Sequence, residues 1–370
     1  MLNRLRTYTR LGRWLGPWAS NDHAPDVIRE RRVVVPTNAA LDSVEVWRFR
    51  PLEAHPRGTW IIAPGLHFAG PADPRFERFA KILAHAGFDV WAPFIPEYLA
   101  LRITPRAFDH FRMVFDAAQN APGRAGKVAV FSISFGSLMA FELAAHPSTR
   151  EQVASLVVFG GYGHFVDTAT FCMTGVVNDT KASAHDPLNL PVLFIHAVDH
   201  LVDAPTDREV LVSVWRRYLA ATWGIESMKH DRRYVVEAER LVDEVPEHLR
   251  EMFLIGCGVT EGGPRLIDPV LRGPDFEHLD PGPYFADIQC PVHLFHGVDD
   301  DVIPHQQLGV LDASLRPHTQ VHTYLTGLYG HTRNDQGTGM GGFSDAFGEL
   351  VTMARMLDTL ALRGTTPHRT

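Results

Sequence analysis

Short apolar runs alternate with segments of helical periodicity along most of the chain. Between the runs, residues 75–85 and 105–115 carry apolar side chains three or four positions apart, which is the spacing of one helix face. The apolar runs, which are rich in Val, Ile and Phe, lie at residues 59–63, 88–93, 128–133, 153–160, 291–297 and 321–325. Strands that alternate with helices predict an α/β fold, in which a mostly parallel sheet has helices on both faces.

Two other regions depart from this alternation. Residues 32–35 and 44–49 predict an antiparallel pair of strands before the parallel part begins. Between residue 161 and about residue 288 the pattern is mainly helical. The predicted organisation is a basic amphipathic segment at 1–30, an α/β core at 31–161 and 289–370, and a helical cap inserted at 162–288, before the strand that carries the predicted acid.

The run at 128–133 leads into a candidate nucleophile, Ser134. A helix-like segment follows it at once, and small residues stand two places before and two places after it, Ser132 and Gly136. A serine on such a sharp strand-to-helix turn needs small neighbours, because larger side chains would strike the adjacent backbone. Ser132 does not fit the same frame, since a nucleophile there would need a small residue at Val130.

A loop with glycine follows the strand at 59–63, in the sequence Pro64-Gly65-Leu66-His67. In acyl-transfer sites built on parallel sheets, one oxyanion-binding amide follows the nucleophile and another comes from this loop. These amides would be the N–H groups of Phe135 and Leu66.

The end of the chain supplies a candidate acid and a candidate base. The strand at 291–297 is followed by three consecutive aspartates, of which Asp300 is the best candidate acid and Asp299 the second. His331 follows the last predicted strand and is the candidate general base. The chain order Ser134, Asp300, His331 is the order of nucleophile, acid and base in one architecture of serine hydrolases.

A second segment, Pro191–His200, is similar to the acid-bearing one and leaves an alternative open. If it is a strand, Asp199 is the acid. We favour Asp300, because Asp199 lacks a preceding glycine turn and Asp186-Pro187 resembles the start of a helix. His196 and His200 are four positions apart, but the glutamate of the zinc-protease motif is missing, so we expect neither a metal nor a cofactor.

These motifs together resemble the α/β-hydrolase superfamily, in its esterase- and lipase-like branch with a serine nucleophile. The resemblance extends from about Val33 to Leu362, apart from the middle insertion. Two positions depart from the family pattern, since Ser132 replaces a glycine and Pro64 replaces a histidine. The resemblance implies a Ser134–His331–Asp300 triad that cleaves a small-molecule ester with an apolar acyl group. An acyltransferase, a thioesterase, an amidase and a ligand-binding member without catalysis share these features and stay open.

Composition and charge narrow the partners. The 370-residue chain is 45% hydrophobic, and its net charge of −8 argues against nucleic acid. Three widely spaced cysteines predict free thiols in a reducing compartment, so we expect a cytoplasmic protein. The first fifteen residues carry four arginines and no acid, with Leu5, Tyr8, Leu11, Trp14 and Leu15 on one helical face. This segment predicts a helix packed on the protein itself or on a partner, with weak contact to a membrane surface as the alternative.

Overall fold

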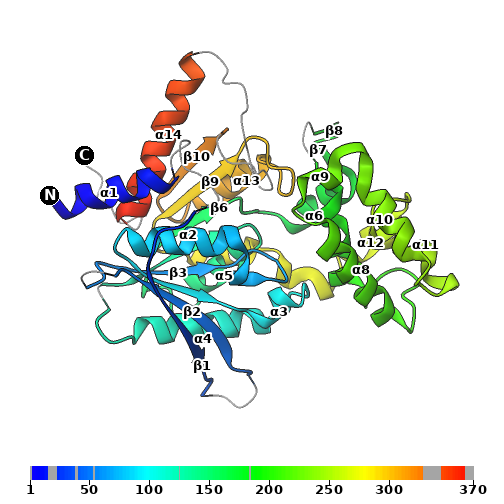
Figure 1. Ribbon diagram of the computed structural model, residues 1–370, viewed down its shortest axis with the longest axis horizontal. Helices are drawn as coiled ribbons and strands as arrows, with labels where there is room; N and C mark the ends of the chain where they lie inside the picture. Colours follow the sequence, from blue (N-terminus) through cyan, green and yellow to red (C-terminus); the bar gives the residue numbers. More distant parts are fainter. Residues whose placement is uncertain are drawn as a thin grey trace.

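A mostly parallel sheet of eight strands forms the centre of the part of the molecule that the structure describes (Figure 1). The structure is a computed structural model that describes residues 2–15, 23–37, 41–52, 55–124, 126–182, 185–327 and 343–362. The strand order is β1-β2-β4-β3-β5-β6-β9-β10, and only the pairs β1–β2 and β2–β4 are antiparallel. The strands are β1 (Ile28–Val34), β2 (Val44–Arg50), β3 (Thr59–Ala63), β4 (Asp89–Pro93), β5 (Val128–Ile133), β6 (Val153–Phe159), β9 (Val292–Gly297) and β10 (Val321–Thr326). The predicted α/β architecture with an antiparallel start is confirmed.

Helices cover both faces of this sheet and form a separate hydrophobic core on each. One core lies between the sheet and α1 (Leu2–Leu15), α2 (Pro74–His85) and α14 (Phe343–Leu362), with Trp60 and Ile62 fully buried in it. The other core lies under α4 (Arg106–Gln119), α5 (Gly136–Ala145) and α13 (Gln306–Leu315). Strands buried on both faces explain why the apolar runs of the sequence are continuous rather than alternating.

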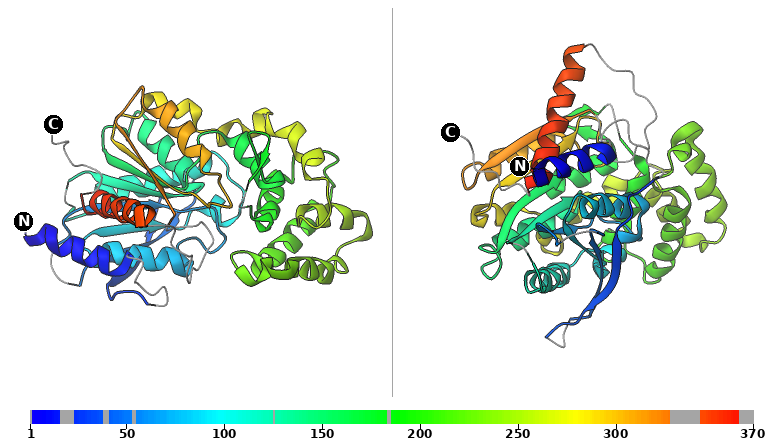
Figure 2. Two further views of the ribbon diagram at one scale, coloured as in Figure 1. Left: turned by 90° about the horizontal axis from the view of Figure 1, so that it is seen from above. Right: turned by 60° about the vertical axis from the view of Figure 1, so that its left-hand side comes forward.

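The segment between β6 and β9 is mainly helical and lies on the side of the sheet away from the two chain ends (Figures 1 and 2). We call residues 162–288 the insertion, and their domain boundaries stay a prediction. Its helices are α6 (Phe165–Thr174), α7 (Leu190–Ala197), α8 (Arg208–Thr222), α9 (Glu226–Lys229), α10 (Arg233–Val242), α11 (Arg250–Gly256) and α12 (Gly263–Leu271), with a two-stranded hairpin of β7 (Val176–Val177) and β8 (Thr180–Lys181). A short 3-10 turn (Pro187–Asn189) leads into α7, and two more (Pro274–Leu279 and Gly282–Asp287) lead back to β9.

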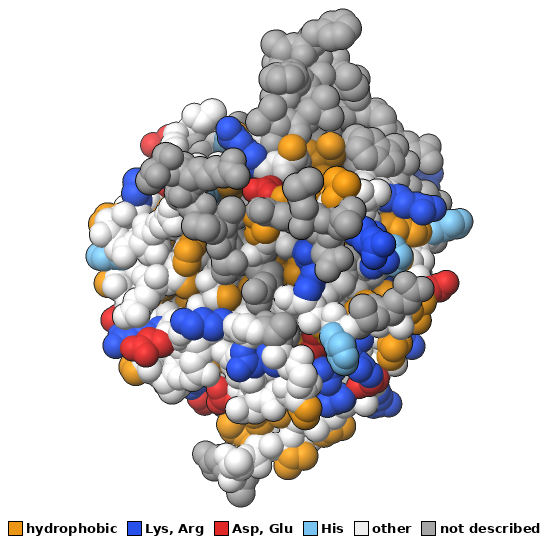
Figure 3. All heavy atoms as spheres, turned by 90° about the vertical axis from the view of Figure 1, so that its left-hand side faces the viewer, with side chains coloured by type: hydrophobic (Ala, Val, Ile, Leu, Met, Phe, Trp, Pro, Cys, Tyr) orange, Lys and Arg blue, Asp and Glu red, His pale blue; other side chains and the backbone are white. Residues whose placement is uncertain are grey.

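Helix α1 packs against α2 and α14 with its apolar side. Leu11 is fully buried, and the Thr7 hydroxyl donates a hydrogen bond to the carbonyl oxygen of Ala86 at 3.1 Å. Arg6 and Arg13 are exposed. Basic side chains are spread over the described part of the molecular face that is on the left in Figure 1 (Figure 3). No helix in the described ranges is both long and apolar enough to cross a membrane. Membrane-surface contact stays a prediction, which would be wrong if the double substitution Arg6→Glu, Arg13→Glu left binding to anionic vesicles unchanged.

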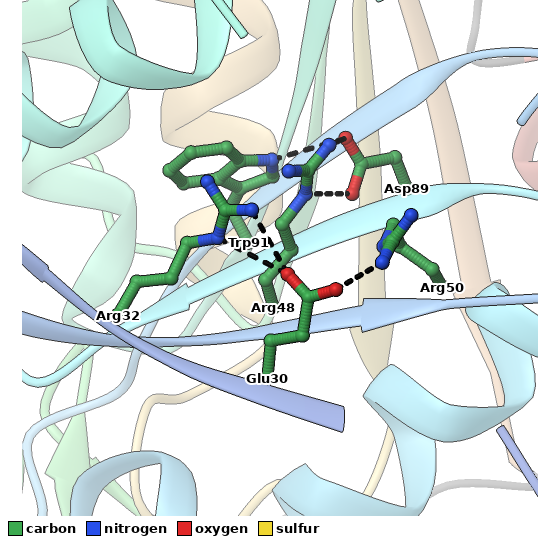
Figure 4. Close-up of polar contacts among 6 residues, drawn as sticks. All are labelled: Glu30, Arg32, Arg48, Arg50, Asp89 and Trp91. Atoms are coloured by element: carbon green, nitrogen blue, oxygen red, sulfur yellow. Dashed lines mark hydrogen bonds and ion pairs between the residues drawn. The ribbon is translucent and has the colours of Figure 1, made fainter. Parts of the chain in front are cut away.

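A buried ion pair joins the antiparallel strands to the parallel ones (Figure 4). Arg48 on β2 donates two hydrogen bonds to the carboxylate of Asp89 on β4, at 2.7 and 2.8 Å. The indole N–H of Trp91 donates a third to the same carboxylate at 3.2 Å. A bidentate pair with an extra donor satisfies charges that would otherwise be costly to bury, and it fixes the register of β2 against β4.

Candidate active site

Ser134 lies in the sharp turn between β5 and α5. Its φ angle is 52°, in the left-handed region that non-glycine residues rarely adopt. Its N–H donates a hydrogen bond to the carbonyl oxygen of Phe159 at 2.8 Å, and its carbonyl oxygen accepts one from the N–H of Ser137 at 2.9 Å. The surrounding backbone therefore holds Ser134 in a strained conformation, as is common at functional sites.

The small residues two positions before and two positions after Ser134 are explained by different surroundings. A Cβ atom at Gly136 would lie 2.4 Å from the carbonyl oxygen of Ala63 and 2.5 Å from that of Pro64, so only glycine fits. Ser132 is fully buried in the sheet, where its hydroxyl lies 3.5 Å from the carbonyl oxygen of Val157. The strand, turn and helix lie where the sequence pattern predicts them.

The two predicted oxyanion amides belong to loops that touch next to Ser134. Phe135 precedes the first residue of α5, and Leu66 lies in the loop after β3. A Cβ atom at Gly65 would lie 3.7 Å from Cβ of Ser134, so this loop runs close to the turn. Within the described ranges, neither the Phe135 nor the Leu66 N–H donates to a protein acceptor. Their role as oxyanion donors stays a prediction.

Asp300 lies in the loop after β9 and is held by its own loop. One carboxylate oxygen accepts hydrogen bonds from the N–H groups of Val302 at 3.0 Å and Ile303 at 2.9 Å. The other lies 3.3 Å from Nε2 of His296, and Asp300 is only 6% exposed. Because β6 separates β9 from β5, the acid loop is two strand spacings from Ser134, about 10 Å across the sheet. An imidazole ring fits between a serine hydroxyl and a carboxylate at this separation.

The alternative acid, Asp199, has different surroundings. Residues 190–197 form helix α7, so the interpretation of this segment as an acid-bearing strand is wrong. Asp199 lies just beyond this helix, is 39% exposed, and forms ion pairs with Arg208 and, at 3.9 Å, with Arg102. Asp299, the second candidate on the acid loop, is more exposed than its neighbour Asp300.

His331 lies outside the described residues, so its role as general base stays a prediction. Strand β10 ends at Thr326, five positions earlier, and lies next to β9. Three strand spacings separate β10 from β5, about 14 Å, whereas five extended residues span up to about 17 Å. The chain is long enough for this histidine to reach Ser134.

Ser134 lines a cavity of about 380 Å³ whose walls come from both the sheet side and the insertion. The sheet side contributes Leu66, Phe135, Phe159 and Val302, and the insertion contributes Phe165, Leu193 and Trp223. Most of the lining is apolar. Cys172 also lines it, but burial, followed by the negative charge of Asp186, raises the pKa of this thiol to about 12, so it is not a thiolate nucleophile. The three cysteines are unpaired.

His67 joins the loop of Leu66 to the insertion. Its ring stacks between Phe68, at 4.6 Å between ring centroids, and Trp223, at 4.8 Å. Burial lowers the pKa of His67, opposed by the charge of Asp73. His164, in contrast, is 40% exposed, pairs with Asp167 at 2.9 Å, and does not line the cavity.

A lysine that the sequence analysis did not single out connects the insertion to the acid loop. The Lys229 ammonium lies 3.0 Å from the carboxylate of Asp186, within the insertion, and 2.8 Å from that of Asp301. Burial disfavours the charge on Lys229, but these two carboxylates raise its pKa above the ordinary value. Asp301 is the neighbour of Asp300, so the ion pair fixes the insertion beside the candidate acid. No sequence signal identifies pairs this far apart in the chain.

His196 is a second residue whose place the sequence pattern did not predict. It lines the cavity from helix α7, and its Nδ1 accepts a hydrogen bond from the N–H of Ile103 at 3.1 Å. Burial, followed by the nearby His278, His200 and Arg102, lowers its pKa to about 3. His200, which the spacing paired with it, instead faces Asp275 at 3.1 Å.

Comparison with known proteins identifies the fold. The sequence matches no protein-family model and no curated protein. The structure is similar to an acylaminoacyl peptidase of Pyrococcus horikoshii, with 10% identity and a TM-score of 0.53, over 94% of this chain and 44% of the peptidase. It is also similar to a 2,6-dihydroxy-pseudo-oxynicotine hydrolase, with 14% identity and a TM-score of 0.51, over 92% of this chain and 70% of that one. The chain has the α/β-hydrolase fold. It spans less than half the length of the peptidase, and identities this low are informative about the fold alone.

Proposed function

We propose that this α/β-hydrolase-fold protein is a serine hydrolase that cleaves a carboxylic ester through an acyl-enzyme. In this mechanism His331 removes the proton of the Ser134 hydroxyl while its oxygen attacks the ester carbonyl. Asp300 orients the imidazole and stabilises its protonated form. The N–H groups of Phe135 and Leu66 bind the oxyanion, and each such donor typically contributes about 3 kcal/mol to the transition state. His331 then gives the proton to the leaving alcohol, and water releases the acid with the same base.

The observation that carries this proposal is the backbone of Ser134. A φ of 52° in a turn closed by Gly136 costs stability, and Ser134 lines a cavity beside two backbone amides that donate to no acceptor among the described residues. An ordinary buried serine needs none of these features. The hydrogen-bond donors around the Asp300 carboxylate and the reach of the chain after Thr326 support the remaining assignments.

The shape and lining of the cavity favour an ester with an apolar acyl group. A largely apolar cavity of about 380 Å³ stabilises a hydrocarbon chain by removing it from water. Because the insertion supplies part of the walls, it would select among acyl groups and limit access of water. Acyl transfer, thioester hydrolysis and amide hydrolysis use the same groups, so the acceptor and leaving group must be determined by experiment.

Labelling with a fluorophosphonate probe tests the nucleophile. The probe should label the wild-type protein at Ser134, and Ser134→Ala should abolish labelling because the proposed base and oxyanion amides serve this hydroxyl. Ser132→Ala is the matched control and should be labelled like the wild type. If the folded wild-type protein is not labelled, a ligand-binding protein without catalysis becomes the better interpretation.

A panel of p-nitrophenyl esters of increasing acyl length, with matched thioesters and anilides, tests the substrate class. We expect the esters to have the highest kcat/KM, with an optimum at an intermediate length set by the cavity. A preference for the thioesters or anilides would instead assign the protein to the corresponding alternative.

A further inference from the structure

His196 presents an unused hydrogen-bond donor to the cavity that contains Ser134. Its Nδ1 accepts the hydrogen bond from Ile103 N–H, and an accepting nitrogen cannot carry the proton of a neutral imidazole. The proton of the neutral ring is therefore on Nε2. Within the described ranges, this Nε2 has no hydrogen-bond partner, and it is not among the fully buried unpaired atoms.

The ring is held in place by the residues around it. Phe276 packs edge-on against it at 5.6 Å between centroids, and helix α7 fixes its backbone. His278 donates to the carbonyl oxygen of Ile103 at 3.0 Å, so histidines bind both the N–H and the carbonyl group of Ile103. A donor held this rigidly loses little entropy when it binds an acceptor.

Several other polar side chains of the cavity wall already have partners. Asn189 accepts a hydrogen bond from the indole N–H of Trp223 at 2.9 Å, and Asp73 pairs with Arg75 at 3.0 Å. The Thr168 hydroxyl donates to the carbonyl oxygen of His164 at 3.0 Å. His67, the other histidine of the wall, has its Nε2 3.8 Å from the Asp73 carboxylate, so among the described residues His196 is the lining histidine whose Nε2 faces no carboxylate.

We propose that the Nε2–H of His196 binds an uncharged acceptor oxygen, such as a keto, ether or second ester oxygen, on the apolar part of the substrate. This inference rests on the proposed function only in that it assumes that Ser134 and His196 serve the same ligand. It narrows the substrate from an apolar ester to one with an oxygen at a fixed distance from the reacting carbonyl. An uncharged group is favoured because an apolar wall with one neutral donor does not offset the desolvation of a carboxylate.

Binding to the Ser134→Ala protein tests the inference without requiring turnover. The probes are p-nitrophenyl octanoate and its 5-, 6- and 7-oxo derivatives, and the signal is quenching of tryptophan fluorescence, to which Trp223 in the cavity wall contributes. We expect one oxo ester to bind about 10-fold more tightly than octanoate, as one well-placed hydrogen bond in an apolar site provides.

Substitutions at His196 separate its two nitrogens. In the Ser134→Ala background, His196→Asn keeps an acceptor near the Nδ1 position for Ile103 but cannot reach the Nε2 position, so the 10-fold preference should fall to about 1. His196→Gln reaches the Nε2 position and should restore part of the preference. His200→Asn, one turn further on, is the matched control and should leave the preference unchanged. Unfolding midpoints close to that of the parent protein show that each variant is folded.

Two outcomes would overturn the inference. In one, no oxo ester binds more tightly than octanoate, and in the other His196→Asn retains the preference. Failure of the proposed function looks different, because the protein with Ser134 intact would then bind an oxo ester preferentially and hydrolyse none of the four.

Discussion

The segments Pro191–His200 and Pro291–Asp300 have nearly the same pattern, yet one is a helix and the other a strand. Both begin with Pro-Val, continue mainly with apolar residues, and carry His, Val and Asp at the same later places. Residues 190–197 form α7 in the insertion, whereas residues 292–297 form β9 between β6 and β10. Length and hydrophobicity alone therefore do not decide the conformation of a short apolar run.

The two segments differ in conformation for different reasons, a local one for α7 and a non-local one for β9. Before α7, the Asp186 carboxylate accepts a hydrogen bond from the N–H of Leu188 at 3.0 Å, and Pro187 lies in the first turn, which favours a helical start. Strand β9 instead finds hydrogen-bonding neighbours on both sides and is fully buried along its length. The lesson is that the available partners, rather than the run itself, select the strand.

Replacing Asp300 and, separately, Asp199 with asparagine tests this comparison and has the largest expected effect. Asp300→Asn should lower kcat/KM by about 10⁴-fold, the loss typical when an asparagine no longer holds the histidine in the correct tautomer. Asp199→Asn should change it less than about threefold, because this carboxylate faces arginines at the surface. The readout is hydrolysis of the preferred p-nitrophenyl ester. A larger loss for Asp199→Asn would invalidate the assignment of the acid loop.

Much of the core could be predicted from the sequence because local rules determine it. The strand before Ser134, the glycine two positions later and the helix that follows are all consequences of one tight turn. The cap at Asp186 also indicated that the next segment begins as a helix. In these places the relevant atoms lie within a few residues of one another, so spacing is informative.

The parts that were missed depend on contacts between distant segments. Lys229 contacts Asp301 across 72 positions, and the His196–Ile103 hydrogen bond spans 93. Neither pair has a motif, because any lysine or histidine on a helix has the same local pattern. Only the folded structure shows which of them face the cavity or the acid loop.

The histidines at equivalent places in the two segments use opposite nitrogens. Nε2 of His296 lies 2.9 Å from the carbonyl oxygen of Ile303 and 3.3 Å from the Asp300 carboxylate, whereas Nδ1 of His196 makes the structural contact. His296→Asn cannot reach the Nε2 position, so it should lower the free energy of unfolding by about 3 kcal/mol by leaving buried acceptors unpaired. His296→Gln should cost clearly less. Urea unfolding measures both, and equal losses would mean that Nε2 does not hold the acid loop.

Acid should destabilise the protein through His196, by a smaller amount. The ordinary pKa of a histidine is about 6.5, and burial lowers that of His196 to about 3 in the folded state. Between these values the unfolded chain binds a proton that the folded chain does not, so the free energy of unfolding decreases as the pH falls. At pH 5 the decrease is about 2 kcal/mol relative to pH 8. The asparagine of His196→Asn does not titrate in this range. The difference in free energy of unfolding between the wild type and this variant, measured with urea, should therefore be about 2 kcal/mol smaller at pH 5 than at pH 8. His200→Asn is the control. A constant difference between wild type and His196→Asn at the two pH values would show that the ring of His196 is readily protonated in the folded protein and is not the neutral donor inferred above.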